Sequence, residues 1–217
     1  MKKLVLFFIL LSLTAAGYSQ KKFSLTFLTS PQVTWMSSDS KEVKADGSFL
    51  GFGYGVEGDF FLGNESYSLV TGLTVSTTGG SLIYNTSTQF DGAQLPAGTK
   101  VDYFLKYLEI PLAVKMFTKD FNRTRFYAQF GLTNWLNIKT KATTSDRSFQ
   151  KEAVRDEVRF YNIGLNVGGG LAYDLGHGNA LTAGIIYSNG LNDLTTNSSV
   201  SDSVLLKSLR FRFGFVF

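Results

Sequence analysis

The chain has 217 residues, a formal net charge of +4 and a mean hydropathy of +0.04. This length suits one β domain, and a small charge without a basic run argues against a nucleic-acid partner. The absence of cysteine excludes disulfides, thiolate metal sites and a lipid anchor on a cysteine.

The N-terminal segment has the layout of an export signal. Lys2 and Lys3 precede an almost wholly apolar run over residues 4–13, and small residues follow up to Ser19. The apolar run is too short for a transmembrane helix. The sequence therefore predicts a signal peptide over residues 1–19 and a mature domain over residues 20–217. Removal of the two lysines lowers the net charge from +4 to +2.

Eight later segments alternate apolar and polar residues with a period of two, as β-strands do. They lie near residues 23–35, 50–62, 67–76, 104–116, 125–138, 161–174, 181–188 and 209–217. Pro31 interrupts the first segment and is expected to bulge or bend it. The last segment places large apolar residues at 209, 211, 213, 215 and 217, with Arg210, Arg212 and Gly214 between them. After the export signal, no helical membrane span is expected.

The connections between these segments alternate in length. Those near 63–66, 117–124 and 175–180 are short, whereas those near 37–48, 77–100, 140–155 and 192–203 are long and polar. With both termini at one end, all short connections lie at that end. This is the pattern of bacterial outer-membrane barrels.

The two faces of the strands predict how the barrel is turned. A soluble lipocalin-like barrel would point its apolar face inward. Here the other face consists mainly of Gly, Ser, Thr and Asn, which suit a narrow eight-stranded interior better than the many Phe, Leu and Ile do. Aromatic residues also gather at the predicted strand ends, as at the two membrane interfaces. We therefore predict an all-β, eight-stranded antiparallel up-and-down transmembrane β-barrel in the cell outer membrane.

One segment resembles a known family. Residues 107–115 read YLEIPLAVK, which resembles the Tyr-Leu-Glu-Ile-Pro-Leu signature of the PorT-like outer-membrane β-barrel family of Bacteroidetes-type bacteria. The resemblance continues at Phe130-Gly131, at Gly164 with Gly168-Gly169-Gly170, and over residues 187–191. It implies a barrel assembled in the outer membrane and, for most members, no defined biochemical activity. Since Pro111 has no N–H, it should sit at a bulge or an unpaired ladder site.

Charged residues on the predicted inner face are the main candidate site. They are Glu57, Asp59, Glu109, Lys115, Arg125, Arg210 and Arg212. Buried charges must pair or be solvated, so we expect a structural ion-pair network; the alternative is a gate or small-ion path. In particular, Glu57 or Glu109 should pair with Arg210 or Arg212.

No catalytic, cofactor-binding or metal site is expected. His177, the only histidine, falls in a short turn at the end opposite the outer leaflet, where a lipid-modifying enzyme would act. Phe217, an aromatic residue on the last strand, resembles the signal that the barrel-assembly machinery reads.

Two function classes remain from the sequence. The first is a non-enzymatic membrane scaffold that presents surface loops. The second is a narrow channel or an accessory component of a transport or secretion machine. The expected partners are outer-membrane lipid, the assembly machinery during insertion, and a surface or secretion-complex protein, with no nucleic acid.

Overall fold

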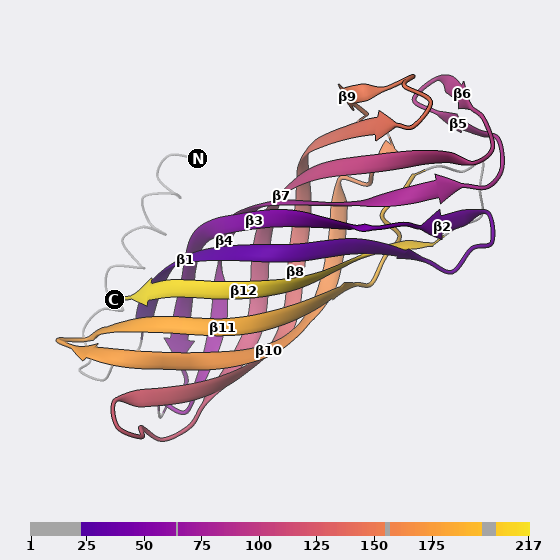
Figure 1. Ribbon diagram of the computed structural model, residues 1–217. Helices are drawn as coiled ribbons and strands as arrows, with labels where there is room; N and C mark the ends of the chain where they lie inside the picture. Colours follow the sequence, from indigo (N-terminus) through magenta and orange to yellow (C-terminus); the bar gives the residue numbers. More distant parts are fainter. Residues whose placement is uncertain (1–22, 64, 155–156, 197–202) are drawn as a thin grey trace, which may run out of the picture.

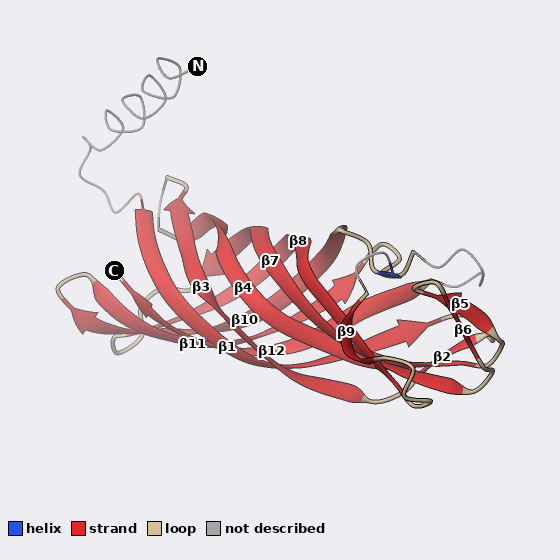
Figure 2. Cartoon of the chain, turned by 90° about the horizontal axis from the view of Figure 1, so that it is seen from above, coloured by secondary structure: helices blue, strands red, loops and turns tan. Residues whose placement is uncertain are grey.

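The chain forms a closed antiparallel β-barrel (Figures 1 and 2). The computed structural model describes residues 23–63, 65–154, 157–196 and 203–217, so the predicted signal peptide lies outside the described residues. The barrel strands are β1 (Phe23–Ser38), β3 (Ser48–Phe61), β4 (Tyr67–Tyr84), β7 (Thr99–Phe117), β8 (Thr124–Thr144), β10 (Tyr161–Gly176), β11 (Asn179–Gly190) and β12 (Val204–Val216). Pairing of β12 with β1 and of β8 with β10 closes the ring. The predicted eight-stranded up-and-down topology is confirmed.

The short and long connections segregate to opposite ends. The end that carries the short connections is here called the turn end. The first barrel strand begins there and the last one ends there, and the N–H of Phe217 donates to the carbonyl of Leu25 at 2.8 Å. The opposite loop end carries the short strands β2 (Val43–Ala45), β5 (Thr88–Phe90), β6 (Ala93–Leu95) and β9 (Gln150–Ala153). In the described part of the chain, no helix has the length and apolarity that a membrane crossing needs.

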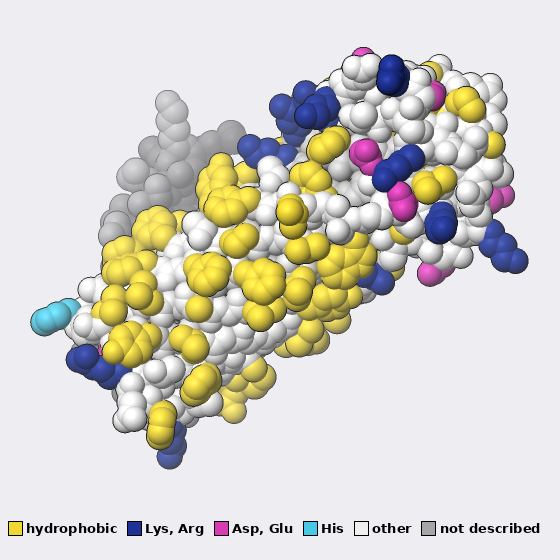
Figure 3. All heavy atoms as spheres, in the orientation of Figure 1, with side chains coloured by type: hydrophobic (Ala, Val, Ile, Leu, Met, Phe, Trp, Pro, Cys, Tyr) yellow, Lys and Arg dark blue, Asp and Glu magenta, His cyan; other side chains and the backbone are white. Residues whose placement is uncertain are grey.

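The outer wall of the turn-end half is apolar. On β7, Leu112, Val114 and Met116 are exposed, while Ala113 and Lys115 between them are buried. Yellow side chains cover this half in Figure 3, and the loop end is mostly white. The predicted apolar belt is therefore present, with its large side chains directed outward.

The strands run further toward the loop end than the sequence indicates. β4 continues to Tyr84, β7 begins at Thr99 and β8 continues to Thr144, so the predicted long connections 77–100 and 140–155 are partly strand. In these extensions the polarity of the wall reverses. Val101, Tyr103 and Leu105 point inward and are buried, and the alternating residues between them face outward.

The interior at the loop end is an apolar core. It comprises Met36, Val43, Leu82, Tyr84, Phe90, Leu95, Val101, Tyr103, Leu105, Tyr107, Trp135, Ala142, Phe149, Val154, Val158, Leu194, Val204 and Leu206. The prediction of a small and polar interior is therefore wrong for this half of the barrel. Above the belt the outer wall meets water, so the large apolar side chains have only the interior in which to be buried.

The prolines and the triple glycine fit the barrel without breaking it. Pro31 lies in a continuous β1–β3 ladder without a register shift, so the predicted bulge is wrong. Pro111 falls between the β4–β7 pairs at Leu112 and Glu109, in a part of the ladder without bridges, which confirms the unpaired site. Gly168–Gly170 keep register with β11. A Cβ at Gly170 would lie 2.7 Å from the Tyr127 hydroxyl, so glycine there leaves room for that ring.

Candidate functional site

The lower charge network lies inside the turn-end half. β3 directs Glu57 and Asp59 inward, β7 directs Lys115 inward and β12 directs Arg212 inward. The Lys115 Nζ lies 3.1 Å from Glu57 and 2.9 Å from Asp59, and an Arg212 nitrogen lies 2.6 Å from Glu57. Two acids and two bases thus balance inside the barrel, as buried charges require.

An upper ion pair lies nearer the loop end. Arg210 donates to Glu109 at 2.5 Å, and the side chain of Glu109 is 2 % exposed. The Ser76 hydroxyl donates to the other carboxylate oxygen. The Arg210 guanidinium also lies 6.0 Å from the ring of Trp135, which belongs to the apolar core. The charged interior therefore meets the apolar core directly at this pair.

The structure brings together six of the seven predicted charges and separates Arg125 from them. Arg125 lies at the turn-end rim, 2.7 Å from Asp120 and 3.2 Å from Glu65. Its hydrogen bond lowers the pKa of the Asp120 carboxyl below the usual range. The prediction that Arg125 belongs to the lumen network is wrong, because β8 begins at Thr124 and leaves this side chain at the mouth.

The two arginines lie two residues apart on β12, and each contacts a different acid. Glu57 meets Arg212 and Glu109 meets Arg210. Both pairs lie within the set expected from sequence, which did not choose between the combinations. The role of Lys115 as the bridge between Glu57 and Asp59 was not predicted from the sequence, although its inward position was.

Uncharged residues complete the network. Gln129 accepts from Arg212 at 3.3 Å, and the Ser68 hydroxyl donates to Asp59 at 2.7 Å. The Lys115 ammonium lies 5.2 Å from the centre of the Tyr127 ring. The alternation along β8 predicts that Gln129 and Tyr127 point inward. Nothing in the local sequence indicates that they contact these charges.

A cavity opens into the barrel from the turn end. Its volume is about 310 Å³, and the lower charge network forms its inner wall, while Asp174 and His177 lie at its mouth. A second space of about 30 Å³ lies beside Glu109 and Arg210. Beyond this pair the apolar core fills the loop-end half.

Phe217 lies on the outer wall at the turn end. It is 52 % exposed, and its ring contacts Phe27 edge-on with the ring centres 5.5 Å apart. Phe215 lies 4.7 Å away between ring centres. The side chain is therefore available on the surface directly after the end of β12, and its role as an assembly signal stays a prediction.

Replacement of Phe217 with serine is expected to reduce the amount of folded protein in the outer membrane. The loss would follow from removal of the terminal aromatic on β12, since a polar residue cannot replace its apolar contact with Phe27. Heat-modifiable migration of membrane fractions measures it, with Phe121→Ser, at an exposed turn position, as the control. Equal folded protein in wild type and Phe217→Ser would contradict this role.

A family model described as "Outer membrane protein beta-barrel domain" matches residues 14–196. The chain belongs to this family. The match and the closed barrel together place the protein in the cell outer membrane. In bacterial barrels of this kind, the apolar belt faces lipid and the long connections face the exterior.

Solved structures of outer-membrane proteins match this chain, and the first of them has a similar fold. Neisserial surface protein A is 13 % identical with a TM-score of 0.52, and the match covers 90 % of this chain and 96 % of that one. OprG from Pseudomonas aeruginosa is 12 % identical, with a TM-score of 0.48 and 89 % and 96 % covered. Ail, the attachment invasion locus protein of Yersinia pestis, is 15 % identical, with a TM-score of 0.39 and 89 % and 99 % covered. A search of curated proteins finds no match.

Proposed function

We propose that this protein is a non-enzymatic, non-conducting barrel that anchors an ordered loop end on the outer surface of the membrane. The observation that carries this proposal is the filled interior. The ion pairs of the turn-end half continue directly into the apolar core, with Arg210 against Trp135. The loop end thus has a packed core of its own. Such a core holds surface loops in place, as contact with a partner requires.

A filled interior of this kind opposes ion passage. An ion that entered the 310 Å³ cavity would meet the balanced charges of Glu57, Lys115 and Arg212. It would then have to pass large side chains such as Trp135, Tyr103 and Tyr84, each at most 2 % exposed. Removing the hydration shell of an ion in such surroundings costs several kcal/mol or more.

The non-enzymatic part of the proposal has separate support. The acids inside the barrel are engaged by basic partners, which leaves them poorly suited as general bases. His177 lies in the turn between β10 and β11, at the end opposite the outer leaflet. Among the described residues, no group of three or more His, Asp and Glu side chains is arranged to hold a metal ion.

Planar-bilayer recording tests whether the barrel conducts. The purified wild-type protein is expected to show no steady conductance. The double variant Trp135→Ala and Tyr107→Ala removes the two aromatic rings next to the upper ion pair, with ring centres 6.4 Å apart, and should introduce conducting events if it folds, which heat-modifiable migration checks. Steady wild-type conductance would favour the channel instead.

A second candidate is an accessory role in a transport or secretion machine. It rests on residues 107–115, through which the chain resembles the PorT-like subfamily. In the barrel this segment alternates inward Tyr107 and Glu109 with outward Leu108 and Ile110. This alternation is what a strand of the barrel wall requires. We therefore assign the chain to the PorT-like subfamily on the sequence of the segment alone. Affinity purification from native membranes tests the role: a stoichiometric partner supports it, and recovery of the barrel alone counts against it.

A further inference from the structure

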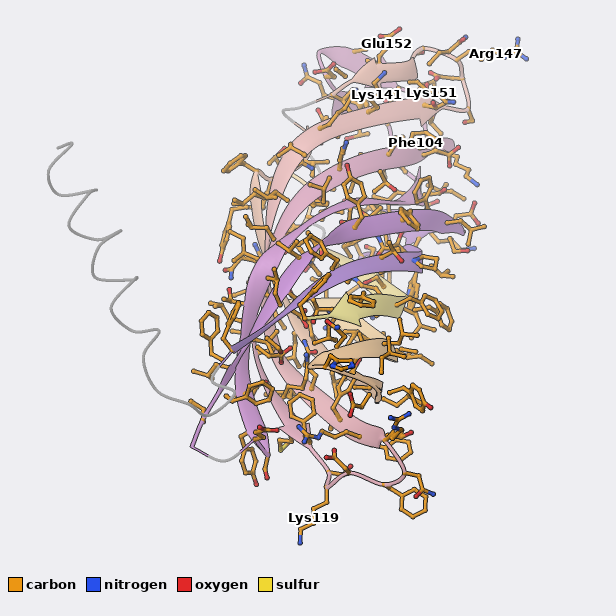
Figure 4. The ribbon with its side chains drawn as sticks, turned by 90° about the vertical axis from the view of Figure 1, so that its left-hand side faces the viewer. Phe104, Lys119, Lys141, Arg147, Lys151 and Glu152 are labelled. Carbon is orange, nitrogen blue, oxygen red and sulfur yellow. The ribbon has the colours of Figure 1, made fainter. Side chains whose placement is uncertain are left out.

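Four lysines form a basic cluster on the outer wall where the apolar belt meets the loop end. They are Lys106 of β7, Lys139 and Lys141 of β8, and Lys151 of β9. Lys106 and Lys139 are direct partners across the β7–β8 ladder, and Lys141 is the partner of Phe104. Figure 4 shows Lys141 and Lys151 at one height beyond Phe104, and Figure 3 shows basic side chains gathered at this border.

The described part of the chain supplies no acidic partner at ion-pair distance for these lysines. Within the described residues, none of the four forms an ion pair, although Lys100 nearby on β7 lies 2.8 Å from Asp46. Like charges directly opposite on neighbouring strands destabilise a sheet. The arrangement of Lys106 opposite Lys139 therefore favours an anion from outside the protein.

The backbone holds the cluster in place. A β-bulge at Lys106 and Tyr107 inserts Ile138 into β8, so that Ile138 and Lys139 are both exposed. Lys151 has a φ of 56°, in the left-handed region that non-glycine residues seldom adopt. Its N–H donates to the Thr143 hydroxyl at 3.1 Å, and its ammonium lies 5.8 Å from the centre of the Phe104 ring.

The height of the cluster matches lipid headgroups. The outward residues of β7 from Met116 to Leu108 are all apolar, and Lys106 is the next outward residue. At about 3.3 Å per residue and a tilt of about 40°, this row spans roughly 20 Å of membrane thickness. With its side chains it fills most of the ~25 Å apolar band of such barrels, so Lys106 falls at the outer interface.

We propose that the basic cluster binds the phosphate groups of the phosphorylated glycolipid of the outer leaflet. Lysines beside an apolar belt extend their methylene stems along it and place the ammonium groups among headgroups. Clusters of this size at a membrane surface attract anionic headgroups, with about a fivefold gain in affinity for each lysine. The aromatic ring of Phe104 lies at the same interface, as interfacial aromatics do.

Lipid binding by the full mature barrel in a zwitterionic detergent tests the proposal. The probes are diphosphorylated lipid A and the same lipid after removal of its phosphates. The wild type should bind the phosphorylated probe more tightly, with affinity that falls as salt rises. The variant with Lys106, Lys139, Lys141 and Lys151 all replaced by glutamine should lose about fivefold in affinity for each lysine, several hundredfold in total, for that probe only.

Two controls keep the result interpretable. Lys119→Gln removes an exposed lysine at the opposite end (Figure 4) and should leave binding unchanged. Replacement of the four lysines by arginine should preserve binding, since the charge is kept. Heat-modifiable migration checks that the glutamine variant and the wild type are both folded. Equal affinity of the two folded proteins for the phosphorylated probe would overturn the proposal. The proposal would also be overturned if the wild type bound both lipid probes equally tightly, or if it preferred an acidic polysaccharide to the phosphorylated lipid.

Discussion

Replacement of Glu109 with glutamine is expected to lower the free energy of unfolding by about 3–5 kcal/mol, because Arg210 is left as an uncompensated buried charge. Replacement of Arg210 with methionine should cost a similar amount, since Glu109 then loses its only basic partner at ion-pair distance among the described residues. The double variant should lose clearly less than the sum of the two single losses. Urea unfolding in liposomes measures all three.

A crossed pair supplies the matched control. Glu57 contacts Arg212 and Lys115, so Glu57→Gln with Arg210→Met combines residues from different ion pairs. Their coupling should be smaller than that of Glu109 with Arg210. Additive losses for Glu109 and Arg210, or equal coupling in both cycles, would show that the upper ion pair does not exist as described.

An arginine at the centre of the apolar belt is the second large effect. Leu112 is 57 % exposed on the outer face of β7, midway between Leu108 and Met116. Leu112→Arg is expected to cost about 2–4 kcal/mol of unfolding free energy, because the charge sits near the bilayer midplane.

Met116→Arg is the control on the same strand and face. It lies at the turn-end edge of the belt, where an arginine costs about 0–1 kcal/mol. Unfolding in liposomes compares the two variants. Equal losses, or a larger loss for Met116→Arg, would mean that the belt is placed at the wrong height.

The outer wall was predictable because it obeys one local rule. On β7 and β12 every second residue of the belt is apolar, and lipid on one side and a narrow lumen on the other leave no other placement. The inward position of Glu109, Lys115 and Arg210 follows from the same alternation. Which acid pairs with which base was not predictable, because the long side chains cross the lumen and their partners are far apart in sequence.

The apolar core at the loop end was missed although β7 carried a signal for it. Its inner face changes from Val101, Tyr103 and Leu105 to Glu109 and Lys115. This change marks the level at which the wall passes from water to lipid, so the buried side changes with it. On β4 the signal was weak, because the segment from 77 to 81 consists of threonine, glycine and serine, which also suit loops.

Thiol accessibility from each side of the membrane tests the sealed interior most directly. The chain has no cysteine, so single substitutions report without background. Ala180 lines the turn-end cavity, and Ala97 is exposed at the loop end. In vesicles with the loop end outside, a small charged thiol reagent added outside should modify Ala97→Cys and leave Ala180→Cys unreacted until the vesicles are opened. Modification of Ala180→Cys from outside at the rate of Ala97→Cys would show a continuous path through the barrel and contradict the sealed interior.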